Sequence, residues 1–402
     1  MAAFSLALVL LLVGPSDVVR LTDGNQVEGR VLLEGEEFVV VRVDSKAREI
    51  PRAEIASVDS LEGWLRRFFT AYGMLQPGNA SGLVDVARFC QARGLTDEAR
   101  LCWLEILTLD PENEIANQAL GGVETSSGWR IPAGSNRSMP LEKLRERNRE
   151  WKNAWELETA HYRLRTNQEL KDAIATALDL ERFYLFFYDV IGTPIGLYNL
   201  EERVRAEVHA DKRSYPQPPV YRDAWFGLAE NTLHVNASGG LRREFLFHEA
   251  VHQLIWNGFR QTRARPGQVP AWADEGLAEY LSTGVSGPPG RSELSPGARH
   301  DVHFQNHGQA DEPLSLDYVL NLGLGDFQSG SSVEAGYSQS YTLVHFLMHG
   351  DRGALRPRFL AFLRSALEGQ GAATHFHREI GLEKDVLESS WHDYSRRIAD
   401  GR

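Results

Sequence analysis

The hydrophobic residues of this chain change their spacing near residue 60. Between residues 17 and 58, apolar and polar residues alternate in short runs, and Asp23-Gly24 supplies a turn signal between two of them. Beyond residue 60, apolar residues recur every three or four positions, as they do in the segment 83–90. Alternation is typical of strands and the longer spacing is typical of helices. The two patterns in separate segments therefore predict an α+β chain.

The composition is that of an ordinary folded chain. Of the 402 residues, 42% are hydrophobic and 24% are charged, which excludes a largely disordered protein. The 43 basic and 55 acidic residues leave a net charge of −12, the wrong sign for binding nucleic-acid phosphates over a large surface. The two cysteines, Cys90 and Cys102, are too few for a disulfide scaffold or a cysteine-rich zinc module. We therefore expect no nucleic-acid partner.

Residues 1–16 have the character of a signal peptide. An apolar run from Phe4 to Val13 is followed by the small residues Gly14 and Ser16 around a proline. No Lys or Arg precedes the run, and a buried first strand is the alternative interpretation. No later run reaches about 18 apolar residues, so we expect no membrane span. The expected location is outside the cytoplasm, as a periplasmic, cell-surface or secreted protein.

The rest of the chain divides into four segments. We expect a small β barrel or sheet at 17–60, a helical region at 61–125, a linker and a charged helix at 126–157, and a larger domain at 158–402.

The helical region carries part of a known repeat pattern. Gly94, Ala99 and Pro111 stand where a tetratricopeptide-type helix pair has its Gly, Ala and Pro, so the stretch resembles one helical-repeat hairpin of that kind. One unit cannot cover its own apolar face and is expected to pack on the next domain. Two roles for this hairpin stay open: it could dock a protein partner, or it could act as a structural spacer.

The sequence His-Glu-Ala-Val-His at positions 248–252 predicts a zinc site. It lies in a predicted helix, 241–256, on which His248 and His252 are one turn apart and project from the same face. Two imidazole nitrogens can then bind one Zn²⁺ at about 2.1 Å. Glu249 projects to one side of the face that the two histidines share. From there it can act as a general base toward water without becoming a ligand.

A second helical segment, 270–280, supplies a candidate third ligand. A catalytic zinc site uses three protein ligands and leaves one position open. Glu275 follows the first motif after 22 intervening residues, within the sequence Trp-x-x-Glu-Gly-x-Ala-x-Tyr. Glu279, one turn later, can accept a hydrogen bond from a ligand histidine and fix its tautomer. For either glutamate alone, a solvated helix face is the alternative interpretation.

Together these motifs resemble the gluzincin metallopeptidases, a superfamily that includes the thermolysin-like and aminopeptidase-N-like families. The peptidase MA-like branch fits best. The resemblance covers residues 158–402 and implies a thermolysin-like domain with one zinc ion per chain, bound by His248, His252 and Glu275. It also implies that Glu249 is the catalytic base and later the proton donor.

The resemblance extends to a tyrosine. The segment 335–344 is similar to the helix start at which aminopeptidase-type gluzincins carry a tyrosine that stabilises the transition state, and Tyr337 is the matching position. Tyr341, one turn later, is the second candidate, and packing within a helix is the alternative role. The segment 227–231 lacks the Met of the family's Gly-x-Met-Glu-Asn amine-binding strand. Glu230 as an amine anchor, and the choice between exo- and endopeptidase, therefore stay open.

Three closely spaced histidines follow these motifs in the sequence. His300, His303 and His307 have a spacing that could hold a second metal on a helix, but Gly, Pro, Gln and Asn surround them. We expect a mobile surface loop at these positions. The Gly-, Ser- and Pro-rich stretch 284–336 is expected to form the rim or lid of a cleft.

The sequence thus predicts a zinc metallopeptidase that hydrolyses peptide or protein substrates. The alternative is a non-catalytic binding or scaffold protein with a vestigial or structural metal site. Such a protein would use the helical repeat and the β module for protein interaction. The intact set of four motif residues favours catalysis.

Overall fold

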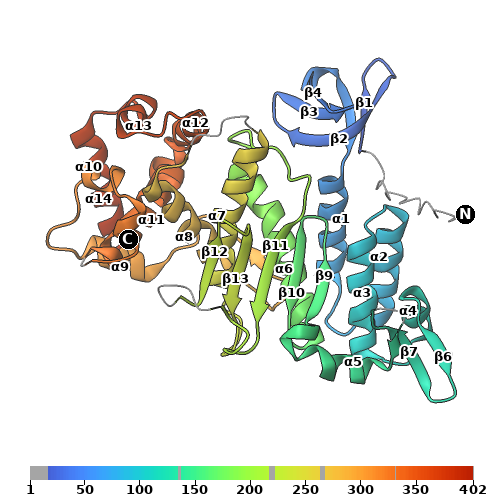
Figure 1. The fold of residues 1–402 in the computed structure, drawn as a ribbon. Helices are drawn as coiled ribbons and strands as arrows, with labels where there is room; N and C mark the ends of the chain where they lie inside the picture. The colour runs from blue at the N-terminus through green and yellow to red at the C-terminus, as the bar shows by residue number, and fades with distance from the viewer. Residues whose placement is uncertain (1–16, 135–136, 217–221, 263–267, 331, 402) are drawn as a thin grey trace, which may run out of the picture.

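The computed structural model describes five stretches of the chain, namely 17–134, 137–216, 222–262, 268–330 and 332–401. An N-terminal β sheet is followed by a group of helices, a central five-stranded sheet and a C-terminal group of helices (Figure 1). The predicted mixture of α and β structure and the N-terminal sheet are confirmed. The predicted signal peptide lies outside the described residues.

The N-terminal sheet is antiparallel and has the strand order β4-β3-β2-β1-β5. Alternate residues of its strands face a small core made mostly of valine, including Val19, Val31 and Val41. Such β-branched side chains suit a pleated, half-buried surface. The strands are β1 (Asp17–Leu21), β2 (Gln26–Glu34), β3 (Phe38–Val43), β4 (Lys46–Pro51) and β5 (Ile55–Asp59).

Four helices follow this sheet. Three of them begin at a side-chain cap, because Ser60, Asn79 and Asn113 accept hydrogen bonds from backbone N–H groups of the first turn. The second and third helices pack on each other, and the thiols of Cys90 and Cys102 are free and buried there. The helices are α1 (Leu61–Met74), α2 (Ala80–Ala92), α3 (Thr96–Leu109) and α4 (Glu114–Ala119).

The segment expected to be a linker and a charged helix contains more structure than that. The strands β6 (Val123–Thr125), β7 (Gly128–Pro132) and β8 (Ser138–Met139) form a small antiparallel sheet. The helix α5 spans Leu141–Asn148, and a 3-10 turn follows at Trp151–Asn153. Since α5 buries two leucines, it is an amphipathic helix rather than the fully solvated one that its charges suggested.

The central sheet has the strand order β12-β13-β11-β10-β9, in which β10, β11 and β13 are parallel and the two edge strands are antiparallel. The helices α6 (Leu170–Phe187) and α7 (Arg243–Thr262) pack against this sheet on its apolar face, which includes Leu164, Val208 and Val235. A π-helical turn extends α6 from Tyr188 to Gly192. The strands are β9 (Trp155–Glu158), β10 (Tyr162–Thr166), β11 (Val204–His209), β12 (Ala224–Gly227) and β13 (Thr232–Asn236).

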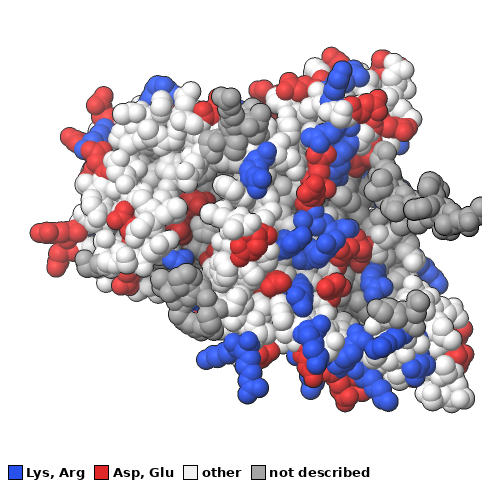
Figure 2. Space-filling model, viewed as in Figure 1, with Lys and Arg blue, Asp and Glu red and all other residues white. Residues whose placement is uncertain are grey.

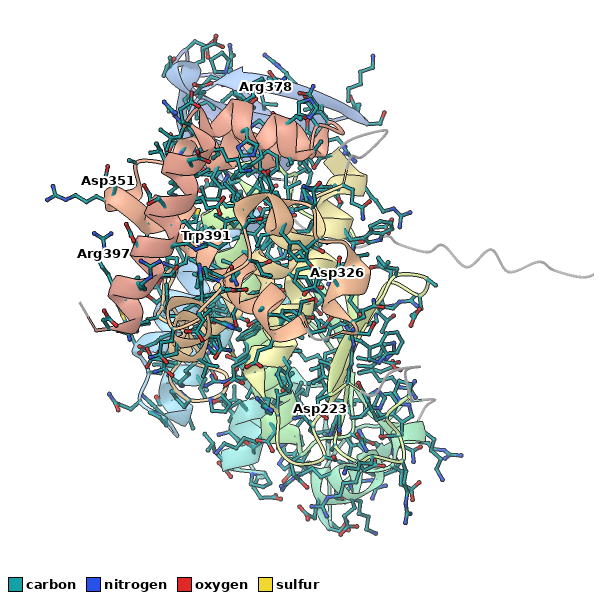
Figure 3. All side chains as sticks on the ribbon, turned by 90° about the vertical axis from the view of Figure 1, so that its left-hand side faces the viewer. Asp223, Asp326, Asp351, Arg378, Trp391 and Arg397 are labelled. Carbon is teal, nitrogen blue, oxygen red and sulfur yellow. The ribbon has the colours of Figure 1, made fainter. Side chains whose placement is uncertain are left out.

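The C-terminal part is mainly helical, and α11 packs against α8, α9 and α14. Figure 3 shows Trp391 of α14 inside this group, whereas Arg378 and Arg397 lie at its periphery. The helices are α8 (Ala271–Thr283), α9 (Asp301–Gly308), α10 (Leu316–Leu320), α11 (Val333–His349), α12 (Arg356–Leu367), α13 (Ala373–Ile380) and α14 (Lys384–Ala399). Shorter elements are β14 (Val285–Ser286), β15 (Glu293–Leu294) and 3-10 turns at Leu324–Phe327 and Gly350–Gly353. Among the described residues, no helix combines the length and the apolar character that crossing a bilayer requires.

The expected surface loop at residues 300–307 is wrong. These residues form almost all of α9, which the side chain of His300 caps and which packs against α11 and α14. The buried residues of α9 are Phe304 and His307, so its apolar pattern is too short to be recognised from sequence. Tertiary packing rather than intrinsic propensity stabilises such a short helix.

A buried series of ionic contacts joins the N-terminal sheet to the rest of the chain. Arg30 of β2 donates to Glu62 of α1, with Nη2 and Oε1 2.6 Å apart. The same oxygen lies 3.4 Å from Nε2 of His161, and Nδ1 of His161 lies 2.6 Å from Oε1 of Glu181 on α6. Burial opposes the charge on Glu62, but the neighbouring Arg30 outweighs it and lowers the pKa of Glu62 to about 2. This carboxylate is therefore ionised and depends on its partners.

We predict that Glu62→Gln lowers the free energy of unfolding by about 3 kcal/mol, because it leaves Arg30 without its main buried partner. Urea unfolding followed by circular dichroism measures the change. The control is Glu201→Gln, which removes a more exposed ion pair between Arg42 of the same sheet and Glu201. That variant should lose less than about 1 kcal/mol. Equal losses in the two variants would contradict the role assigned to burial.

Candidate metal centre

Two neighbouring helices bring the predicted zinc ligands together. α7 carries His248, Glu249 and His252, and α8, which packs against α7, carries Glu275. Nε2 of His248 and Nε2 of His252 are 3.2 Å apart. Oε2 of Glu275 lies 3.3 Å from the first of these nitrogens and 3.5 Å from the second. The three atoms that would bind a metal thus form a nearly equilateral triangle.

The packing of α8 explains how Glu275 reaches this position. A Cβ atom on Gly276 would lie 2.7 Å from the carbonyl oxygen of Ser340 on α11, so glycine is required for the observed approach of these helices. At the start of α8, the ring of Trp272 is buried and stacks on Phe362. Both features of the Trp-x-x-Glu-Gly segment therefore serve to fix α8 against its neighbours.

Two further carboxylates contact the Nδ1 atoms of the histidine rings, which are the ring nitrogens that do not face Glu275. Oδ2 of Asp274 lies 3.0 Å from Nδ1 of His252, and Oε1 of Glu279 lies 3.2 Å from Nδ1 of His248. In each ring, Nδ1–H donates to the carboxylate, so in the neutral ring Nε2 carries its lone pair toward Glu275. Glu279 occupies the position that its sequence spacing suggested. The sequence did not predict a role for Asp274, because nothing in its sequence position distinguishes it from a solvated residue next to the ligand Glu275.

The centre concentrates negative charge that a cation can neutralise. Oε2 of Glu275 is buried and has no hydrogen-bond partner among the described residues. Burial opposes the charge on His248, but its close contacts with the carboxylates of Glu275 and Glu279 outweigh it and raise the pKa of His248 to about 10. Burial likewise opposes the charge on Glu275, yet the two histidines hold the pKa of this carboxyl well below its usual range. Without a metal, protons therefore occupy the imidazoles.

The residues present fit a zinc ion. Ligand atoms about 2.1 Å from a tetrahedral metal are about 3.4 Å from one another, close to the three distances between His248, His252 and Glu275. Two imidazoles and one carboxylate also form a ligand set typical of catalytic zinc. The side chains of the two histidines are 13% and 15% exposed, so neither ring is fully shielded from solvent.

Glu249 and Tyr337 lie next to these ligands. Glu249 is half-buried on α7 and follows His248 directly. The ring of Tyr337, on the second turn of α11, is 6.3 Å from the ring of His248. Burial and the charge of Glu275 raise the pKa of Tyr337 above its usual value, against the opposing charge of Arg222. The phenol therefore keeps its proton and can donate a hydrogen bond into the site.

Tyr341, the second candidate, has a different environment. Its hydroxyl donates to the carbonyl oxygen of Ala298 at 2.9 Å and accepts from the backbone N–H of His300 at 3.0 Å. Tyr341 is fully buried, and its hydroxyl anchors the segment before α9. This hydrogen bonding fits a structural role, which leaves Tyr337 as the tyrosine at the metal centre.

The helix that replaces the expected loop extends the centre by one more residue. Nε2 of His303 lies 3.1 Å from Oε2 of Glu279, and Nδ1 of His303 lies 3.1 Å from the Ser338 hydroxyl. Glu279 is thus held between His248 and His303. The spacing of the three histidines allowed a second metal, although a surface loop was expected. In the fold, His300 and His303 lie close to Glu279, and the contact of His303 supports this carboxylate behind the first centre. His307 instead contacts Thr342 and His392.

Glu230, the possible amine anchor, lies elsewhere in the fold. It stands in the turn between β12 and β13, where its side chain is 43% exposed and its Oε1 is 3.3 Å from Nε2 of His234.

Comparison with known proteins adds one match. Residues 245–366 match the model of a family described as "Protein of unknown function (DUF1570)". The matched segment is less than a third of the chain, yet it contains the histidine motif, Glu275 and Tyr337. The chain is similar to this family over the metal centre, and the description names no activity. No curated protein matches the chain.

We predict that the apparent affinity for Zn²⁺ increases with pH by at least about tenfold per unit between about pH 6 and 8. The reason is that zinc must displace a proton from His248, whose pKa is raised to about 10 by its carboxylate partners. Competition with a chromophoric chelator, corrected for the chelator's own protonation, measures this slope. Histidines with the ordinary pKa of about 6.5 would give a plateau above about pH 7 instead.

Proposed function

We propose that this protein is a zinc-dependent peptidase of the gluzincin type, with residues 158–402 as a thermolysin-like domain. The observation that carries the proposal is the triangle of Nε2, Nε2 and Oε2 atoms from His248, His252 and Glu275, with Glu249 and Tyr337 beside it. A structural zinc site has four protein ligands. The group of three potential ligands, the number typical of catalytic zinc, favours a catalytic site.

Each residue has a defined task in this proposal. When bound, zinc supplies a Lewis acid and makes a water molecule acidic enough to lose a proton near neutral pH. Glu249 accepts that proton and later donates it to the amine that leaves. Tyr337 donates a hydrogen bond to the oxygen on which negative charge develops. Asp274 and Glu279 keep the imidazoles in the tautomer and orientation that the ligands need.

The position of the edge strand β12 is an argument for a peptide as the substrate. β12 is an edge strand of this sheet and packs against α7, the helix that carries both histidines. An edge strand presents unpaired backbone N–H and C=O groups, and an extended peptide can pair with them. Arg222 precedes β12 by two residues, and its charge acts on Tyr337. A peptide that pairs with β12 would therefore lie close to the reacting groups.

The other parts of the chain fit accessory roles in this proposal. The apolar run at residues 4–13 supports export of the protein. The α2–α3 pair, in which the two helices pack on each other, would either dock a peptide or protein partner or act as a structural spacer.

We predict that Glu249→Gln reduces cleavage of peptides by at least about 100-fold, because the general base is lost. Zinc content should stay unchanged, since Glu249 is not a ligand. Wild type and variant are incubated with a mixture of unrelated peptides, and mass spectrometry measures the products with and without a chelator.

The matched control is Glu244→Gln, the same substitution at an exposed position in the first turn of α7. It should leave cleavage unchanged. Cleavage that survives Glu249→Gln, or a zinc-loaded wild type that cleaves none of the peptides, would favour a non-catalytic binding protein.

We predict that Tyr337→Phe lowers kcat by about 100-fold or more with little change in KM, since its hydrogen bond forms mainly in the transition state. Tyr341→Phe should leave kcat nearly unchanged and lower the thermal unfolding midpoint, because it frees the backbone at Ala298 and His300. Steady-state kinetics and thermal unfolding of both variants test this pair. The reverse pattern would assign the catalytic role to Tyr341.

A further inference from the structure

A second group of potential metal ligands lies on the other face of the central sheet. Glu207 and His209 are two residues apart on β11, so they share a face, and Glu207 is paired with His234 on β13. The apolar residues Ala206 and Val208 alternate with them and point toward the helix-covered face. Figure 2 shows charged side chains of both signs gathered over this sheet.

The two histidines are buried although they lie on the polar face. On β10 and β11, the neighbouring residues Arg163 and Arg205 on this face are exposed, whereas the His209 side chain is 1% exposed and that of His234 is 9% exposed. Trp151 covers His209, with ring centroids 3.9 Å apart, and Trp225 covers His234 at 4.4 Å. Two indole rings thus exclude water from a pair of imidazoles.

These buried imidazoles have unsatisfied ring nitrogens. Both nitrogens of His209 and Nδ1 of His234 lack a hydrogen-bond partner within the described stretches of the chain. Leaving such a group unpaired in the interior costs about 1–3 kcal/mol. Oε2 of Glu207 lies between them, 3.4 Å from Nδ1 of His234 and 3.7 Å from Nε2 of His209.

A second carboxylate, that of Glu230, orients His234 toward this centre. Oε1 of Glu230 lies 3.3 Å from Nε2 of His234, so Nε2–H can donate to it and Nδ1 is left with its lone pair toward Glu207. A ligand histidine commonly donates its other N–H to a carboxylate in this way. The arrangement repeats the one that Asp274 and Glu279 provide at the first centre.

We propose that Glu207, His209 and His234 bind a second divalent transition-metal ion, separate from the catalytic centre. One potential ligand atom of each residue lies within 4.8 Å of the others, so the side chains would have to close up only slightly to reach the spacing of about 3.4 Å between the ligands of a tetrahedral zinc ion. Imidazole ligands favour ions such as Zn²⁺ or Cu²⁺ over Mg²⁺ and Ca²⁺, which prefer oxygen. The ion would link β11 to β13 at the polar face of the sheet.

Zinc stoichiometry tests the proposal. Metal-free full-length protein is dialysed against buffered Zn²⁺, and bound zinc is measured by elemental analysis. Wild type should bind two equivalents. Glu207→Gln, which keeps the side-chain shape and removes the charge, should bind one, and so should His252→Gln, which acts on the other centre. The double variant should bind none. One equivalent in wild type and none in His252→Gln would overturn the proposal, as would two equivalents in Glu207→Gln.

Tryptophan fluorescence gives an independent measurement that also serves if Glu207→Gln does not fold. Cu²⁺ quenches nearby indoles, and Trp151 and Trp225 stack on the two proposed ligands. Stoichiometric Cu²⁺ added to the His252→Gln protein should quench part of the emission. Replacing both tryptophans with phenylalanine in that background should abolish the quenching. Absence of quenching, or quenching that survives the double replacement, would contradict the assignment. Neither measurement depends on peptide cleavage, so the two proposals can fail separately.

Discussion

The hydrogen bonds between α8 carboxylates and the Nδ1 atoms of the α7 histidines are the constraint on which the candidate metal centre depends. Asp274 and Glu279 each hold one ring from behind. This arrangement turns both Nε2 atoms toward Glu275, whose own helix is fixed by the contact of Gly276 with α11. Side chains held in this way lose little additional freedom when they bind a cation.

The same helix contacts separate the roles of two tyrosines that are one turn apart. Tyr341 is buried and uses its hydroxyl to hold the backbone before α9. That contact helps to position α9, and His303 of this helix contacts Glu279. Tyr337 is half-buried and contacts His248. One tyrosine thus maintains the scaffold on which the other can act, although the sequence places both on similar faces of α11.

Local geometry determined how much of the site could be predicted. His248, Glu249 and His252 lie on one helix, so their arrangement follows from the helical period. Glu275 is recognisable because its sequence setting resembles a known family. His303 was not predicted to support the centre, because α9 has few apolar residues and forms through packing. The group around Glu207 was also missed, since it depends on the pairing of β11 with β13, which are separated by more than twenty residues in the chain. The coarse α+β class follows from hydrophobic spacing alone.

The contact between Arg30 and Glu62 has a consequence for how this chain can evolve. The guanidinium belongs to the N-terminal sheet, whereas the carboxylate and the neighbouring His161 belong to the parts that follow. Loss of the sheet would leave the Glu62 carboxylate without the guanidinium that stabilises its charge. The N-terminal sheet therefore cannot be replaced by an unrelated domain without further changes. Recombination between this sheet and the rest of the chain requires compensating substitutions on both sides of the contact.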